Sequence, residues 1–111
     1  MYLSMADPAY TLLIESTLVP GARETFSFAQ ERVAIGRALA NDVMLSNTMR
    51  LVSRQHAEIR RVADVYWLVD LGSKNATWLN GYRLEVERPY ALNHGDHFRV
   101  GDYRIEFILS T

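Results

Sequence analysis

Turn signals recur along this sequence at short intervals, and they constrain the fold more than any other feature. Residues 19–21, 63–64, 80–81 and 101–102 are types that favour tight turns, and short apolar segments lie between them. Together with the other Gly-, Pro-, Asn- and Asp-containing turns of the chain, such signals recur about every 8–12 residues, and no stretch carries the period of a long helix. The pattern predicts an all-β fold, either an antiparallel β-sandwich or a barrel, with about ten short strands.

The expected strands follow period-two alternation and β-branched or aromatic enrichment. Residues 38–47 contain weak helical character, but Asn41-Asp42 interrupts it and a short strand follows. In the last strand Tyr103, Ile105 and Phe107 share one face, which predicts an apolar inner surface. The expected strands are Tyr10–Ile14, Thr25–Phe28, Arg32–Ile35, Val43–Leu45, His56–Val62, Val65–Leu71, Thr77–Leu79, Tyr90–Leu92, Phe98–Val100 and Tyr103–Leu109, with Leu84–Val86 as a further short candidate.

The length of 111 residues suits one domain, which we expect over residues 10–109 after a tail at 1–9. The chain has no cysteine, which rules out a disulfide framework and a thiolate metal site. Neither a secretory signal nor an apolar run of the roughly 20 residues that span a membrane is present. Twelve basic residues face thirteen acidic ones, so no net field attracts nucleic acid or membrane. We expect a cytoplasmic domain that binds neither.

Catalysis and metal binding find little support. Ser53, His56 and Asp70 include the side chains of a hydrolase triad, but no nucleophile-elbow motif surrounds Ser53. His56 is better explained as a structural histidine bonded to loop backbone groups. His94 and His97 lie three apart on a turn, without the further ligands that a metal site needs. We therefore expect no enzyme activity, no metal and no cofactor.

Phosphate recognition is the more coherent interpretation of the polar loops. A phosphorylated side chain carries about −1.5 to −2 charges and three acceptor oxygens. Its site needs a guanidinium, a hydroxyl donor and free backbone N–H groups. Arg37, Ser53-Arg54 and the 73–75 loop offer these donor types from three separate parts of the chain. Nothing in the composition shows that the three loops converge.

Four sequence blocks together resemble a forkhead-associated (FHA) domain, from about Tyr10 to Leu109. The blocks are Gly36-Arg37, S-R-Q-H at residues 53–56, S-K-N-A-T-W-L-N-G at residues 73–81 and L-N-H-G-D at residues 92–96. The resemblance implies an eleven-stranded β-sandwich of two twisted sheets. It also implies that loops at one end bind phosphothreonine peptides, with a preference for phosphothreonine over phosphoserine.

The resemblance also assigns roles to individual residues. Arg37 and Ser53 would hold the phosphate, Arg54 would assist and Lys74 would flank it. Asn75 would bond the peptide backbone beside the phosphothreonine. The implied supporting residues are Gly36, His56, Thr77, Asn80 and Gly81.

Two positions depart from the family pattern or qualify it. Ala76 stands where the motif usually has glycine, and alanine there costs on the order of 1 kcal/mol if the backbone needs a positive φ. Leu51, two residues before Ser53, is apolar where some members use a charged residue to select the third residue after the phosphothreonine. We therefore expect an apolar or unselective preference at that peptide position.

The sequence thus favours a non-catalytic signalling module that binds a phosphothreonine-containing protein or peptide, the product of a Ser/Thr kinase. The alternative is a phosphate-independent interaction or assembly module, for which aromatic residues such as Tyr66, Trp78, Tyr82 and Tyr90 give some material. The partner's identity and the oligomeric state stay open.

Overall fold

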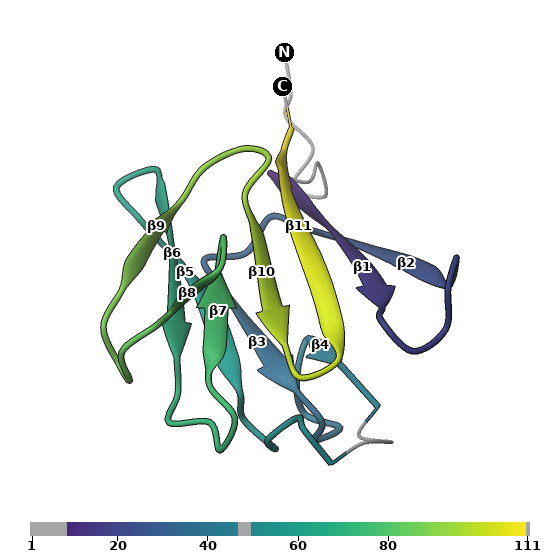
Figure 1. The fold of residues 1–111 in the computed structure, drawn as a ribbon. Helices are drawn as coiled ribbons and strands as arrows, with labels where there is room; N and C mark the ends of the chain where they lie inside the picture. Colours follow the sequence, from purple (N-terminus) through teal and green to yellow (C-terminus); the bar gives the residue numbers. More distant parts are fainter. Residues whose placement is uncertain (1–8, 47–49, 111) are drawn as a thin grey trace.

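Short strands make up the regular structure of the computed structural model, which describes residues 9–46 and 50–110. Eleven strands form two sheets, which confirms the predicted all-β sandwich (Figure 1). The strands are β1 (Tyr10–Ser16), β2 (Arg23–Phe28), β3 (Arg32–Gly36), β4 (Val43–Met44), β5 (Ala57–Val62), β6 (Val65–Asp70), β7 (Thr77–Leu79), β8 (Tyr82–Arg83), β9 (Tyr90–Leu92), β10 (His97–Val100) and β11 (Tyr103–Leu109).

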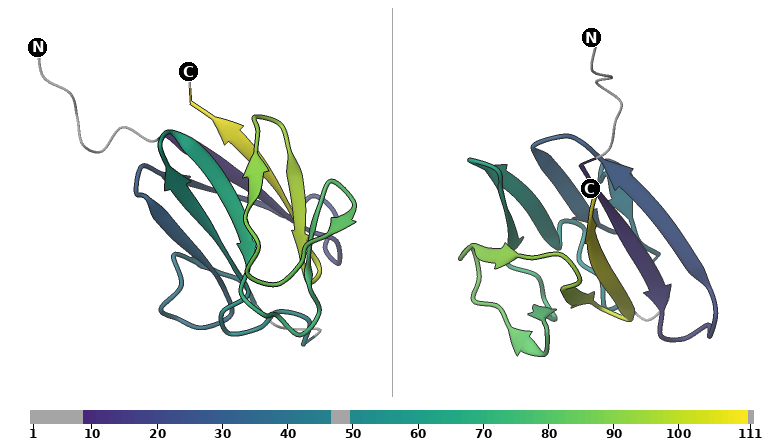
Figure 2. Two further views of the ribbon diagram at one scale, coloured as in Figure 1. Left: turned by 90° about the vertical axis from the view of Figure 1, so that its left-hand side faces the viewer. Right: turned by 90° about the horizontal axis from the view of Figure 1, so that it is seen from above.

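The two sheets lie face to face as separate layers (Figure 2). One sheet has the order β2-β1-β11-β10-β7-β8, and the other has the order β4-β3-β5-β6-β9. All paired strands are antiparallel except β3 and β4, which pair in parallel with Ile35 opposite Val43. The loop of residues 37–42 carries the chain back beside Ile35, so β4 runs in the same direction as β3.

Alternating side chains from both sheets fill the space between the layers. Leu12 and Ile14 of β1 meet Ile105 and Phe107 of β11, and all four are buried. The Tyr10 ring lies 5.0 Å from that of Phe107 and 5.1 Å from that of Tyr66 on the opposite sheet. Such aromatic contacts between layers favour a single packing arrangement. The predicted inner face of the last strand is confirmed.

The structure corrects one of the expected strands. Residues 84–86 form no strand, and β8 occupies Tyr82–Arg83 directly after the turn at residues 80–81. Because the turn has only two residues, the chain pairs with β7 immediately after it, with Leu79 opposite Tyr82 and Trp78 opposite Arg83. Val86 contributes only an isolated bridge to Asp70.

The expected tail lies almost wholly outside the described residues. Ala9, its last residue, already belongs to the sheet region, since its N–H donates to the Phe28 carbonyl at 2.7 Å and its carbonyl accepts from Ser110 at 2.9 Å. Within the described ranges no helix is long and apolar enough to cross a membrane.

Candidate functional site

Three loops meet at the end of the sandwich opposite the two termini (Figure 1). They join β3 to β4, β4 to β5, and β6 to β7. The Arg37 N–H donates to the Ser53 carbonyl at 3.1 Å, and the Lys74 N–H donates to Ser53 Oγ at 3.0 Å. Asn75 Nδ2 donates to the Leu51 carbonyl at 3.3 Å. These bonds give the convergence that the sequence could not show.

Gly36 allows the first two loops to pack closely. A Cβ built on Gly36 would lie 2.2 Å from the Arg54 carbonyl oxygen and 2.9 Å from Asn41 Nδ2. Both are fixed groups, because Asn41 Nδ2 itself donates to the Arg54 carbonyl at 2.7 Å. Any side chain at residue 36 would therefore push the Ser53 loop away from Arg37.

His56 joins the second and third loops from beneath. It is fully buried, its Nδ1 accepts from the Ser53 N–H at 3.1 Å, and its Nε2 lies 2.8 Å from the Ala76 carbonyl. The two contacts require a neutral ring with the proton on Nε2. Burial lowers the pKa of His56, partly offset by the bond to Ala76 and by the charge of Asp70. The ring thus stays neutral and holds Ser53 in place.

Asp70 orders the third loop, a role that the sequence did not reveal. Its buried carboxylate accepts from the N–H groups of Gly72 and Ser73, from Ser73 Oγ and from Thr77 Oγ1. Four donors on one carboxylate fix the backbone on either side of Lys74. A carboxylate at a strand end followed within three residues by a serine was a recognisable signal for such a turn.

Ala76 adopts a φ of 68°, so the backbone at this position does need the positive φ that favours glycine. The left-handed conformation strains an alanine by about 1 kcal/mol relative to glycine. The buried Ala76 methyl and the hydrogen bond that the Ala76 carbonyl accepts from His56 Nε2 hold the residue there. The loop therefore keeps the turn without the usual glycine.

The three loops enclose an open groove of about 440 Å³, which we call the loop groove. Its lining residues are Arg37, Arg50, Val52, Ser53, Lys74 and Asn75. Four of the five predicted contact residues are thus brought together. Arg50 was missed, because it lies in a segment that the sequence marks only as a loop.

Arg54, the fifth predicted contact, does not line the loop groove. Its side chain is exposed, and its carbonyl accepts from the Ala38 N–H at 3.3 Å as well as from Asn41. The backbone of Arg54 therefore supports the Arg37 loop. A contact between its guanidinium and a ligand stays a prediction.

The predicted supporting residues lie at two places. Thr77 is buried and its hydroxyl donates to Asp70. The Asn80–Gly81 turn lies at the far end of β7, where Asn80 Nδ2 donates to Asp96 at 3.1 Å and Asn80 Oδ1 accepts from the His97 N–H at 3.1 Å. That turn joins β7 to the start of β10 and makes no part of the loop groove.

The charge of the loop groove is one-sided. Arg37, Arg50 and Lys74 line it, and in the described part of the chain none of them has a carboxylate within ion-pair distance. The Ser53 hydroxyl accepts from Lys74, which leaves its own proton for a ligand. Three cations and a hydroxyl donor have the chemistry that a compact, multiply charged anion requires.

The contacts do not assemble a hydrolase triad. The ring of His56 bonds the backbone N–H of Ser53 rather than its hydroxyl, and the Asp70 carboxylate bonds loop donors. Nor do three potential metal ligands gather anywhere among residues 9–46 and 50–110. The His94 Nδ1 atom accepts from the Leu109 N–H at 3.1 Å.

Comparison with known proteins gives one consistent family. The FHA domain model matches residues 33–101. A curated oxoglutarate dehydrogenase inhibitor from Corynebacterium jeikeium is 38% identical over 89 residues, which are 80% of this chain and 58% of that protein. The glycogen accumulation regulator GarA of Mycolicibacterium smegmatis is 32% identical over 101 residues, which are 91% of this chain and 61% of GarA. The chain thus spans about three fifths of the length of these relatives.

A solved structure shows the same fold. An FHA domain studied for its phosphothreonine-dependent interactions superposes with a TM-score of 0.77 at 29% sequence identity. The superposition covers 92% of this chain and 97% of that one.

Proposed function

This chain belongs to the FHA domain family, and on that premise we propose that its loop groove binds phosphothreonine in an extended segment of a partner protein. The domain is a binding module with no catalytic activity of its own. The observation that carries the proposal is the convergence of Arg37, Ser53 and Lys74 on one groove without an acidic side chain in its lining. A phosphate dianion offers the charge and the three acceptors that these donors require.

Each residue has a distinct task in the proposal. The Arg37 guanidinium makes a bidentate contact with the phosphate, and Ser53 donates its hydroxyl proton to a phosphate oxygen. Arg50 and Lys74 add charge at the rim, with Arg54 further out. The Asn75 side chain turns from the Leu51 carbonyl to the peptide backbone. Its present bond of 3.3 Å is long, so the exchange is inexpensive.

The partner is a phosphorylated product of a Ser/Thr kinase. Two relatives carry regulatory names, an inhibitor of oxoglutarate dehydrogenase and a regulator of glycogen accumulation. By analogy the target of this chain is a metabolic enzyme or a regulator of one, bound without chemical change. The expected cytoplasmic location suits such a target.

The test is a phosphothreonine peptide array probed with wild type and with Arg37→Ala. We expect retention of phosphothreonine peptides by wild type and loss of about 10²-fold in affinity for Arg37→Ala, because one bidentate charge-assisted contact disappears. Arg88→Ala, on the β9 side of the molecule, is the matched control and should bind as wild type does. The phosphoserine versions should bind more weakly.

Failure of folded wild type to retain any phosphothreonine peptide would contradict the proposal. The second candidate is phosphate-independent assembly, favoured by exposed Leu18, Val19 and Met44 around a groove beside β1 and β4. Partner capture that persists after phosphatase treatment and in Arg37→Ala would support that candidate.

A further inference from the structure

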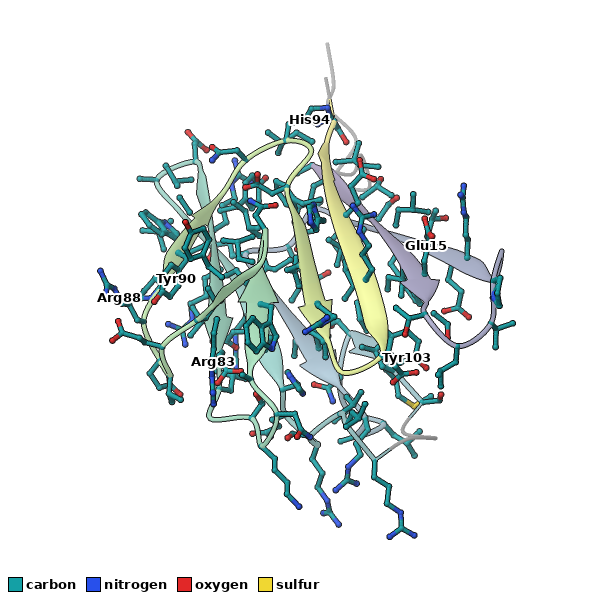
Figure 3. The ribbon with its side chains drawn as sticks, viewed as in Figure 1. Glu15, Arg83, Arg88, Tyr90, His94 and Tyr103 are labelled. Carbon is teal, nitrogen blue, oxygen red and sulfur yellow. The ribbon has the colours of Figure 1, made fainter. Side chains whose placement is uncertain are left out.

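Lys74 is the only lysine of the chain, beside eleven arginines. A lysine amine can lose its proton and react as a nucleophile, whereas a guanidinium stays protonated in proteins. Lys74 is exposed and lines the loop groove. Nitrogen-tipped side chains project from this end of the sandwich in Figure 3. The one lysine amine of the chain therefore lies where a phosphate is expected to bind.

The backbone of Lys74 is held beside the hydroxyl that would contact this phosphate. The Lys74 N–H donates to Ser53 Oγ at 3.0 Å. Asp70 accepts from the Ser73 N–H at 3.2 Å and from Thr77 Oγ1 at 2.7 Å, one on each side of the lysine. The anchored backbone leaves the flexible four-carbon stem of the lysine free to fold over an anion in the groove.

No acidic side chain engages the Lys74 amine in the part of the chain that the structure describes. The six ion pairs found there involve other cations, and Arg37 and Arg50 of the loop groove are not among them either. A ligand that carries a phosphate supplies the missing negative charge. A phosphate bound by the two guanidinium groups would bring whatever is attached to it next to the amine.

We propose that the loop groove directs acyl phosphates to Lys74 and that Lys74 is a site of acylation. The inference rests on the proposed function, because it uses the same phosphate contacts for a second class of ligand. In an acyl phosphate, a single oxygen joins the reactive carbonyl carbon to the phosphate. When Arg37 and Ser53 hold the phosphate, this carbon is presented to the amine of Lys74.

The reaction transfers the acyl group from oxygen to nitrogen, and nothing is oxidised or reduced. The neutral amine of Lys74 attacks the carbonyl carbon, and an N–C bond forms. The C–O bond to the phosphate breaks, and the phosphate leaves with that electron pair and takes up the proton that the nitrogen loses. Arg37 and Arg50 stabilise the charge on the departing phosphate. Holding both reactants in one groove raises the rate further.

Acylation of Lys74 should weaken phosphothreonine binding. The lysine is consumed in a single reaction, so the domain is modified without acting as a catalyst. The amide that forms replaces one of the three cations of the loop groove with a neutral group. We expect the affinity for a phosphothreonine peptide to fall about three- to tenfold, because one charge-assisted contact is lost.

The test follows acetylation of Lys74 by acetyl phosphate, with mass spectrometry of peptide digests as the readout. For wild type the rate should saturate as acetyl phosphate rises, and inorganic phosphate should inhibit it. Arg37→Ala should react about tenfold more slowly, because the phosphate is no longer held. Arg88 projects from the side of the molecule, away from the loop end (Figure 3), so Arg88→Ala should react as wild type does.

Two further reagents separate guidance by the phosphate from the ordinary reactivity of the amine. N-hydroxysuccinimidyl acetate carries no phosphate, and the thioester of acetyl coenzyme A lies far from its phosphates. With either reagent, the rates of acetylation of wild type and Arg37→Ala should agree within about twofold, because neither places its acyl group through the Arg37 contact. A dependence on Arg37 that is confined to acetyl phosphate identifies acyl phosphates as the source of the acyl group.

Lys74→Arg is the matched control for the effect on binding. It keeps the positive charge but has no amine, so treated and untreated Lys74→Arg should bind a phosphothreonine peptide equally. Treated wild type should bind the peptide more weakly than untreated wild type does. Thermal unfolding verifies that each variant is folded.

Equal rates for wild type and Arg37→Ala with acetyl phosphate, linear in its concentration and indifferent to inorganic phosphate, would overturn the inference. Lys74 would then be an ordinary surface amine. The proposed function would stand in that case if the same preparation binds the phosphothreonine peptide. Acetylation that depends on Arg37 in a protein that retains no phosphothreonine peptide would support the acylation site and contradict the proposed function.

Discussion

Individual residues at the site are constrained by packing as much as by ligand chemistry. Gly36 has no space for a Cβ, since the Arg54 carbonyl lies 2.2 Å from where it would be. Gly101 is similarly restricted, with Val52 Cγ2 at 2.8 Å from a built Cβ. The sequence marks Gly101 as a hairpin turn residue, and the structure adds that it presses β10–β11 against the Ser53 loop. Both glycines therefore hold the loop groove in shape.

His56 should make stability depend on pH near neutrality. The folded pKa lies below the ordinary value of 6.5, so the unfolded chain binds the proton more readily. The contribution is complete above about pH 6.5 and is lost as the pH falls from there toward the lower folded pKa. Urea unfolding at about pH 7.5 and 5.5 should show a larger loss of stability for wild type than for His56→Gln.

An NMR titration of the His56 ring gives an independent measurement. Its signal should keep the neutral Nε2-protonated form as the pH falls below 6.5, the ordinary pKa of a histidine side chain. A pKa of His56 at or above the ordinary value of 6.5 would contradict a neutral ring that is hydrogen-bonded to both Ser53 and Ala76.

At the scale of elements, the β6–β7 loop owes its form to one carboxylate at the end of β6. Asp70 accepts four hydrogen bonds from the segment that carries Lys74 and Asn75. Strands β6 and β7 belong to different sheets, so this short loop also connects the two layers at the site. The loop geometry thus depends on a buried charge-assisted network.

Asp70→Asn should weaken both stability and binding. An amide has one acceptor oxygen in place of two, and it leaves buried donors such as Thr77 Oγ1 without a partner, at about 1–3 kcal/mol. Chemical unfolding and the phosphothreonine peptide titration measure the two effects. Asp64→Asn, an exposed residue paired with Arg61, is the control and should change neither. Wild-type affinity in Asp70→Asn would show that the loop is held by other contacts.

At the scale of the whole molecule, charge is separated although its sum is close to zero. The formal net charge is −1, yet Arg37, Arg50, Arg54 and Lys74 gather at the end away from the termini. A local positive field attracts an anionic peptide regardless of the net charge.

The association rate of a phosphothreonine peptide should therefore fall as salt rises from about 50 to 500 mM, because the Debye length shrinks below about 5 Å. Stopped-flow mixing measures this rate. The dependence of the association rate on salt concentration should be weaker in Lys74→Ala, which removes one charge at the rim of the loop groove. It should stay unchanged in Arg88→Ala. A rate that is indifferent to salt would argue against an electrostatic encounter at the loop groove.

Local signals in the sequence determined where most strands lie along the chain, most of their bounds to within two residues, and the inventory of donors. Period-two alternation and turn residues depend on neighbours in the chain, so β11 and the turn at residues 101–102 could be predicted from them. The same locality explains the misplaced strand at residues 84–86, where only pairing with β7 ends β8 early. The family resemblance supplied the roles of Arg37, Ser53, Lys74 and Asn75.

Tertiary structure alone decided which donors share a surface. Arg50 enters the loop groove and the Arg54 side chain does not, although Arg54 follows Ser53 directly. The register of the six-stranded sheet sets Glu15 opposite Arg104, although the two are far apart in the sequence. Alternation places both on outer faces without saying which strands are neighbours. Strand order across a sheet depends on long-range pairing, and each loop bends according to contacts from the opposite layer. The types of donor residues could therefore be predicted from the sequence. Their arrangement into one site depends on how the two sheets and their loops pack.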